Sequence, residues 1–310
     1  SAASDVYKRQ MLERGYTMHH AISQDKQGNI LATVSKTSAK IANGKDVRIN
    51  DFIIRMDPEK GEILQEWDLV HMLDSARYGM TDYNLTADPY AQNASNWAHN
   101  NGIVEWGNNY LATARYQGIF KFNKAGGIEW IISPHGYWRD RYLKLLLNPL
   151  HADGTPITDP DVIAGTKNCD DFEWPWGCHT AVPLPNGHIF YFNNGYGRNF
   201  KLDFTDRKNV YTCGIEYEVD EVNRTVRQVW QYGKERGTAY FTPARSGVQY
   251  LEQTGNRLIC PGMSNVLSNG NRGARVTEVD PETQEIVFEL ELEDAIYQRV
   301  YRMSLYPDNQ

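Results

Sequence analysis

Three histidines in this chain of 310 residues share one place relative to a turn rich in Gly and Asn. His20, His99 and His179 each stand seven to nine residues before the asparagine of such a turn. If these segments are the innermost strands of a repeated sheet, equivalent positions converge on one axis, and three imidazoles meet at one mouth of a channel. Imidazole binds zinc or copper, and near neutral pH it also serves as nucleophile, acid or base. The spacing therefore predicts one composite site.

The residues near these histidines indicate which chemistry to expect. Asn101 follows His99 by two residues, so it lies on the same side of a strand, and Arg115 belongs to the next strand of that repeat. A guanidinium and an amide suit an oxyanion such as sulfate or phosphate better than a cation, and no carboxylate occupies the repeat positions. We therefore favour an anionic substrate over a metal, the alternative being a polar, water-filled channel without chemistry. The histidines outside this frame, interpreted as background, are His19, His71, His135, His151 and His188.

The elements that must position these side chains repeat four times. Each copy consists of a Gly or Asn turn, a strand, a polar insertion, a second strand, an acidic turn and a strand ending near Trp. Repeats of this kind predict an all-β fold, a β-propeller with about four blades present in this chain. The blade-like repeats span about 11–69, 96–133, 176–232 and 246–310, with insertions at 70–95 and 134–175. We expect a short helix within 138–149 and a last strand at Tyr301–Tyr306.

Composition excludes several classes of partner. The net charge is −7 and no basic run occurs, which argues against nucleic acid and anionic membrane surfaces. No apolar stretch approaches the roughly 20 residues of a transmembrane helix, and no signal peptide begins at residue 1. Residues 1–10 fit no structural pattern, so we expect them to be a non-native leader and the propeller domain to occupy 11–310.

Four cysteines fall into two pairs. Cys169 and Cys178 bracket a short aromatic loop and either form a disulfide in an oxidising compartment or remain free. Cys213 and Cys260 lie in apolar strand patterns, so we interpret them as buried thiols. The loop itself, Phe172–Trp176, is either a platform for aryl rings or packing at the rim.

Four segments of the chain, from about residue 12 to the end, carry a resemblance to a known family. They are NWAHNN at 96–101, TARYQGIFKF at 113–122, WGCHTAVPLPNG at 176–187 and VWQYGKERG at 229–237. Together they resemble the bacterial arylsulfate sulfotransferases that do not use the nucleotide donor PAPS. The resemblance implies a periplasmic six-bladed propeller preceded by a small β domain, so that this chain lacks that domain and roughly two blades. A homodimer, if one forms, would then use the missing domain.

The resemblance also implies an activity and roles for individual residues. A sulfuryl group would pass from an aryl sulfate to a phenol in ping-pong fashion, without a cofactor. His179 matches the transiently sulfated histidine, and His99 and His20 match the other active-site histidines, one of which would be the acid or base. Asn101 and Arg115 match the sulfate-binding residues, and Tyr301 matches a tyrosine near the C-terminus.

This sequence departs from the family pattern at three positions. Cys178 precedes the predicted nucleophile where the family usually has Gln, and its displacement from the family disulfide puts the bridge to Cys169 in doubt. Arg245 replaces a smaller polar residue and is either an extra anion contact or a surface arginine. Two other classes of function stay open: a non-catalytic propeller that binds an anionic or aromatic ligand, and a metal-dependent hydrolase.

Overall fold

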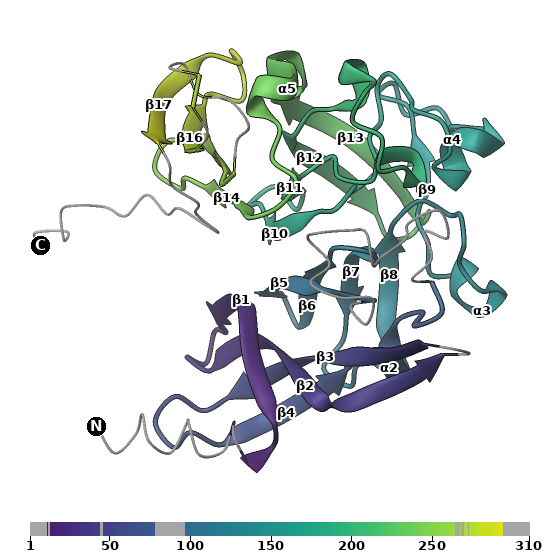
Figure 1. The fold of residues 1–310 in the computed structure, drawn as a ribbon, viewed down its shortest axis with the longest axis vertical. Coiled ribbons are helices and arrows are strands. Elements are labelled where there is room, and N and C mark those ends of the chain that lie inside the picture. The colour runs from purple at the N-terminus through teal and green to yellow at the C-terminus, as the bar shows by residue number, and fades with distance from the viewer. Residues whose placement is uncertain are drawn as a thin grey trace, which may run out of the picture.

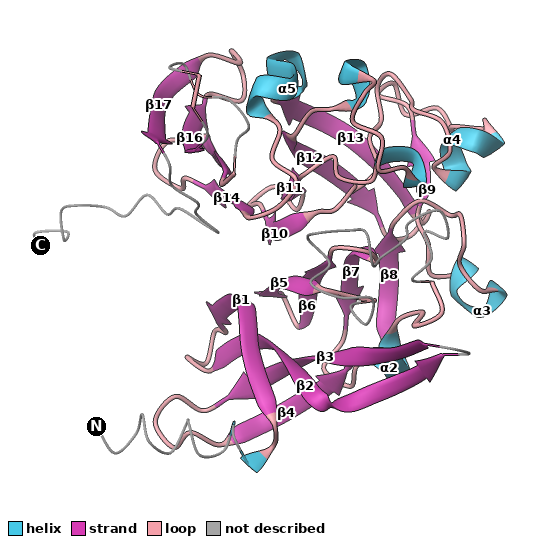
Figure 2. Ribbon diagram, in the orientation of Figure 1, coloured by secondary structure: helices cyan, strands magenta, loops and turns pink. Residues whose placement is uncertain are grey.

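A computed structural model describes residue 11 and residues 13–43, 46–77, 97–263, 267, 270–271 and 273–293. Its four antiparallel sheets are arranged in a ring, so the prediction of an all-β propeller is confirmed (Figures 1 and 2). The predicted strand at 301–306, which contains Tyr301, lies outside the described residues. Within the described part of the chain, no helix is long and apolar enough to span a membrane.

The first two sheets come from the N-terminal half of the chain. Strands of the first sheet are β1 (Tyr16–Gln24), β2 (Ile30–Asn43), β3 (Asp46–Met56) and β4 (Ile63–Asp68). Strands of the second sheet are β5 (Asn100–Trp106), β6 (Asn109–Ala114), β7 (Gly118–Phe122) and β8 (Ile128–Ile132). In both sheets consecutive strands pair, as a meander requires.

The other two sheets follow the same order. Strands of the third sheet are β10 (His179–Pro183), β11 (Ile189–Asn193), β12 (Cys213–Asp220) and β13 (Thr225–Tyr232), with β9 (Asn148–Leu150) added in parallel beside β13. Strands of the fourth are β14 (Ser246–Tyr250), β15 (Arg257–Pro261), β16 (Gly273–Val279) and β17 (Ile286–Glu293). The short helices are α2 (Leu69–Met72), α3 (Asp140–Leu143), α4 (Pro160–Ala164) and α5 (Gly237–Tyr240), and the 3-10 turns are Arg198–Phe200, Arg207–Asn209 and Lys234–Arg236.

The acidic turn that repeats in the sequence is one hydrogen-bonded motif in all four sheets. It joins the third strand of each sheet to the fourth and begins at Asp57, Asn123, Asp220 and Asp280. In each copy a side-chain Oδ1 accepts from two backbone N–H groups further along the turn, at 2.8 to 3.1 Å. Asn and Asp favour such turns because their side chains satisfy backbone donors locally.

Apolar side chains fill the spaces between neighbouring sheets. Trp67 of β4 packs edge-on against Tyr110 of β6, with ring centroids 4.8 Å apart, and this contact joins the first two sheets. Ion pairs join the later sheets: Lys121 to Glu221, at 2.5 Å, and Arg257 to Glu216, at 2.7 Å. The innermost strands β1, β5, β10 and β14 contact one another in that order, and so they surround the axis.

The insertion at 134–175 is less helical than the sequence suggests. The helix expected within 138–149 is limited to α3, a single turn at Asp140–Leu143, and Asn148 and Pro149 belong to strand β9 instead. Pro149 lacks an N–H, so it is tolerated on an edge strand, where β9 pairs only with β13 among the strands of that sheet. This added strand fixes the start of the segment that leads to His179.

Candidate active site

Three histidines from three different sheets lie beside one another at the axis. His20 belongs to β1, His99 directly precedes β5, and His179 is the first residue of β10. The ring centroids of His20 and His99 are 4.5 Å apart, and those of His20 and His179 are 6.2 Å apart. His99 and His179 are buried, whereas His20 is partly exposed. The structure therefore brings together the three histidines that the spacing singles out.

The backbone at these positions adopts a conformation that side chains other than glycine rarely take. His20 has φ of 58°, His99 has 54°, and Thr180, directly after His179, has 43°. His20 and Thr180 each lie within an irregularity in the pairing of the innermost strand with its neighbour. His99 lies directly before such an irregularity. Left-handed residues in strands cost roughly 1–3 kcal/mol each and gather at functional sites, where bulges redirect side chains. Here they accompany the histidines at the axis.

The fourth sheet has its own left-handed residue at the equivalent place. Arg245 directly precedes β14 and has φ of 60°. It is exposed, yet it lies close enough to His20 to contribute to lowering the pKa of that histidine. Of the two interpretations left open for this residue, its position favours the one in which it faces the site.

Burial and positive neighbours keep two of the imidazoles neutral. Desolvation is the largest cause that lowers the pKa of His20, to about 2, and of His99, well below its usual value. Electrostatic interactions with His179, His19 and Arg115 lower both pKa values further. Arg245 adds to the shift of His20, and His20 adds to the shift of His99. An anion in the site would oppose these effects. The site thus carries positive charge on guanidinium groups and holds neutral imidazoles, an arrangement suited to an oxyanion.

His179 is held in one tautomer. Its Nδ1 lies 2.6 Å from Oδ1 of Asn194 and 3.2 Å from the carbonyl oxygen of Gly177. Asn194 donates through Nδ2 to the carbonyl of Thr242, at 2.8 Å, so the atom facing His179 is its oxygen. Because both groups near Nδ1 are acceptors, Nδ1 carries the proton and Nε2 carries the lone pair.

Asn194 is a site residue that the sequence-based prediction does not include, although the sequence carries a signal for it. Asn194 stands seven residues after Gly187, and Arg115 stands seven residues after Asn108, at the corresponding turns of the third and second sheets. The frame that singled out Arg115 therefore also points to Asn194.

Arg115 is almost fully buried beside the histidines. It is 1% exposed, its Nη2 donates to the carbonyl of Pro243 at 2.8 Å, and its guanidinium lies 4.5 Å from the ring centroid of Tyr196. A stacked and hydrogen-bonded guanidinium has little freedom to move, so its charge is presented in a fixed direction.

Asn101 fastens the second sheet to the strand that carries His179. Its Nδ2 donates to the carbonyl of Cys178 at 2.8 Å, and its Oδ1 accepts from Thr113 at 2.7 Å. The role in sulfate binding stays a prediction, while these contacts show that Asn101 positions the residue directly before His179.

A family model described as Arylsulfotransferase (ASST) matches residues 4–302 of the chain. The chain belongs to the arylsulfotransferase family. Two curated relatives share the name arylsulfate sulfotransferase AssT. The one from Escherichia coli O6:H1, strain CFT073, is 28% identical over 336 residues, covering 98% of this chain and 56% of the relative. The one from Lelliottia amnigena is 28% identical over 331 residues, covering 96% and 54%.

The chain spans about half the length of these curated relatives. Among solved structures, a europium-containing methanol dehydrogenase matches with a TM-score of 0.34 and 10% identity, over 89% of this chain and 49% of the other. A similarity this weak carries no argument about fold or activity.

His19 lies beside His20 of the candidate site, which corrects its interpretation as background. Its ring centroid lies 5.2 Å from that of His20, and its Nε2 lies 3.5 Å from Oδ1 of Asp51. Successive residues of a regular strand face opposite sides, so a regular β1 would point only one of the two histidines inward. The irregular pairing between Met18 and Ile22 breaks that alternation.

The aromatic loop packs into the interior. Phe172, Trp174 and Trp176 are each 3% exposed, and the indole of Trp174 donates to the carbonyl of Val162 at 2.8 Å. Asn193 holds the loop by accepting from the backbone of Trp176 and donating to that of Trp174. The structure therefore supports packing as the role of this loop.

The proposed disulfide is not formed in the structure, where all four cysteines are free thiols. Cys178 is fully buried and its Sγ faces the carbonyl of Ala114, whereas the Sγ of Cys169 donates to Asp171 at 3.1 Å. Desolvation raises the pKa of the Cys178 thiol to about 12. Cys213 and Cys260 are buried, as predicted.

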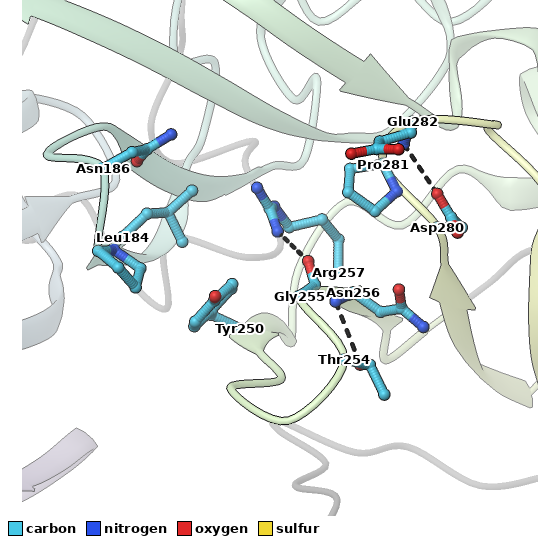
Figure 3. A pocket seen from close by; sticks show the side chains of 11 residues that line it. Leu184, Asn186, Tyr250, Thr254, Gly255, Asn256, Arg257, Asp280, Pro281 and Glu282 are labelled. Atoms are coloured by element: carbon cyan, nitrogen blue, oxygen red, sulfur yellow. Dashed lines mark hydrogen bonds between the residues drawn. The ribbon is translucent and has the colours of Figure 1, made fainter.

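Two pockets lie between elements of the propeller: one among the innermost strands and one between two neighbouring sheets. One, of about 390 Å³, is lined by residues of the four innermost strands, including Ile22, Ile103, Val182 and Val248, and it also contacts Thr180, the residue after His179. The other, of about 400 Å³, lies between the third and fourth sheets, beside the C-terminal ends of β10 and β14 (Figure 3). Its Arg257 is already paired with Glu216.

Proposed function

We propose that the protein transfers a sulfuryl group from an aryl sulfate to a phenolic acceptor through a sulfohistidine on His179, without PAPS. The observation that carries the proposal is the tautomer of His179, because two acceptors at Nδ1 leave the lone pair on Nε2. That imidazole lies in a positively charged cluster with Arg115 and two neutral histidines, and the family of the chain is consistent with this reaction.

In the first half-reaction, the lone pair of His179 Nε2 forms a bond to sulfur. The bond between sulfur and the aryl oxygen breaks, and its electrons leave with a phenolate. A phenol is a workable leaving group because its pKa is about 10. The guanidinium of Arg115 would stabilise the sulfuryl oxygens as charge shifts in the transition state.

In the second half-reaction, the oxygen of the acceptor phenol forms a bond to sulfur and the bond to His179 breaks. The phenol proton passes to His99 or His20, which are neutral in the free protein and so can accept it. The negative sulfuryl group would oppose the effect of Arg115 and raise the pKa of both histidines while it is bound.

The pocket at the innermost strands is the natural place for the aryl groups. Its apolar side chains, Ile22, Ile103, Val182 and Val248, suit a ring, and its lining includes Thr180, the residue directly after His179. As part of the proposal, Asn101 positions His179 and the reaction takes place in the periplasm. Tyr301 stays a predicted substrate contact.

Peptide mass spectrometry tests the proposal directly. After brief exposure to an aryl sulfate without acceptor or PAPS, the peptide that contains His179 should gain one sulfuryl group, and adding a phenol should remove it. The His179→Ala variant should show no adduct and no phenol release, whereas the His71→Ala variant, which changes an exposed histidine, should behave as the parent.

Other outcomes distinguish the alternatives. Ligand binding without adduct or phenol release in a folded parent would favour a binding module, and activity lost on chelation would favour a metal-dependent hydrolase. A requirement that donor and acceptor bind together before any phenol leaves would exclude the two-step mechanism.

A further inference from the structure

A cluster of side chains of the kinds that bind metals lies on the outer edge of the third sheet, away from the axis. His151 directly follows β9, and Cys169 and Asp171 precede the aromatic loop. The ligand atoms of these three residues all lie within 4.8 Å of one another, and no other such group occurs in the described part of the chain.

Asp171 is the centre of this cluster. Its Oδ1 lies 2.9 Å from Nδ1 of His151 and 3.1 Å from Sγ of Cys169, and its Oδ2 accepts from the backbone N–H of Ala152 at 2.9 Å. Groups from His151, Cys169 and Ala152 thus converge on this one carboxylate.

We propose that His151, Cys169 and Asp171 bind a zinc ion, with a water molecule as the fourth ligand. Thiolate, imidazole and carboxylate are the ligands zinc uses in proteins. With metal–ligand bonds of about 2.0–2.3 Å, a tetrahedral site places ligand atoms roughly 3.3–3.6 Å apart, so small side-chain shifts suffice. The side chains of His151 and Asp171 are 40% and 37% exposed, which leaves a path for the ion and the water.

In this proposal the ion takes the place of a proton on two ligand atoms, Sγ of Cys169 and Nδ1 of His151. Without metal, the Cys169 thiol and the Nδ1–H of His151 both donate to Asp171. On binding, Cys169 loses its proton to solvent and the His151 proton moves to Nε2, so that one proton is released for each ion. A nucleophilic role for Cys169 fits less well, because its thiol donates to the carboxylate and burial raises its pKa.

The site would fasten both ends of the segment from 151 to 171. That segment contains α4 and leads through Phe172–Trp176 to His179. Cys169 is a free thiol in the structure, so the proposed metal would be the link between the two ends of the segment. It has no part in the proposed sulfuryl transfer, so the two proposals stand or fall separately.

Cobalt titration under reducing conditions tests the site, since Co²⁺ reports thiolate ligands by a charge-transfer band in the near ultraviolet. One equivalent should give that band together with visible bands of a tetrahedral ion, and zinc should displace the cobalt. Cys169→Ser should abolish the charge-transfer band, while the Cys260→Ala variant, which changes a buried thiol on β15, should keep it.

A second pair of variants keeps the test valid if a cysteine variant misfolds. Asp171→Asn should weaken zinc binding by roughly tenfold or more, whereas Asp203→Asn, an exposed carboxylate that holds the same kind of Asp-x-Thr turn as Asp153 but lies in another loop, should leave it unchanged. Affinity should rise about tenfold per pH unit while the thiol is protonated in the free chain. The absence of a thiolate band in the parent, its survival in Cys169→Ser, or equal effects of the two aspartate variants would overturn the proposal.

Discussion

Oδ1 of Asn194, on the segment after β11, lies 2.6 Å from Nδ1 of His179 at the start of β10. Ser246 also donates to this oxygen, at 3.2 Å, and the amide nitrogen is fixed by Thr242. Contacts with Ser246 and Thr242 thus fix the orientation of the amide whose oxygen sets the tautomer of His179. In the proposed reaction Asn194 is a positioning residue that does not touch the sulfuryl group.

Asn194→Ala should lower the rate of sulfuryl transfer more than it changes substrate binding. Removing the acceptor frees His179 to rotate or change tautomer, and losses of such supporting contacts are typically about 10- to 100-fold. Steady-state kinetics should show the loss in kcat with KM nearly unchanged. The Asn186→Ala variant, at a remote turn, is the control, and a change confined to KM in Asn194→Ala would contradict the positioning role.

Arg245→Asn should weaken the capture of an anionic donor. Asn tolerates left-handed φ, so the variant removes the charge of Arg245 while the backbone at 60° is retained. We expect a severalfold fall in kcat/KM for an aryl sulfate at low salt, and a weaker dependence on ionic strength, because an exposed charge acts mainly on association. Arg224→Asn is matched in backbone conformation, with φ of 55°, but lies on the outer turn between β12 and β13 and should have no effect.

Burial of neutral histidines should make the fold sensitive to mild acid. In the unfolded chain His20 and His99 take up protons near their ordinary pKa of about 6.5, whereas in the folded chain their pKa values are far lower. The unfolded state therefore binds more protons below this pH, and stability falls as pH decreases, by up to about 1.4 kcal/mol per pH unit for each histidine.

Urea unfolding at about pH 7.5 and about pH 5.5 measures this effect. His99→Gln should reduce the loss of stability between the two conditions, and His71→Gln, which changes an exposed histidine, should not. An equal loss in the parent and in His99→Gln would show that His99 is not held neutral in the folded chain.

The repeated turns predict a contrast between two substitutions at Asp220. Asn keeps the Oδ1 that accepts from Val222 and Asn223, as Asn123 does in the second sheet, so Asp220→Asn should preserve Tm at neutral pH. Asp220→Ala leaves those backbone donors to solvent and should lower Tm. Hydrogen bonds from Asn223 lead the causes that lower the pKa of Asp220 in the folded chain. Its contribution to stability is therefore present above the pKa of the unfolded carboxyl and is lost as the pH falls through the lower pKa of the folded state. Thermal melts at neutral and acid pH should show that Asn at this position removes only the part of the pH dependence that Asp220 contributes, while the part from His20 and His99 remains.

The sequence by itself determined the propeller, the four hydrogen-bonded turns and the three histidines that meet at the axis. These features are local patterns repeated at a regular interval, and a repeated pattern forces equivalent residues into equivalent places. His20, His99 and His179 lie at a similar number of residues before the turn in their repeats, and this similar spacing brings them from three sheets to one point.

Only the tertiary structure decided which partners those residues meet. The acceptor at His179 Nδ1, the approach of His19 to His20 and the position of Arg245 depend on bulges and on the packing of neighbouring sheets, which no alternation of residues encodes. The separate surroundings of Cys169 and Cys178 and the parallel strand β9 likewise arise from contacts between distant segments. Hydrogen bonds and pKa values are set by the atoms that folding places within a few ångströms, and sequence distance does not fix that proximity.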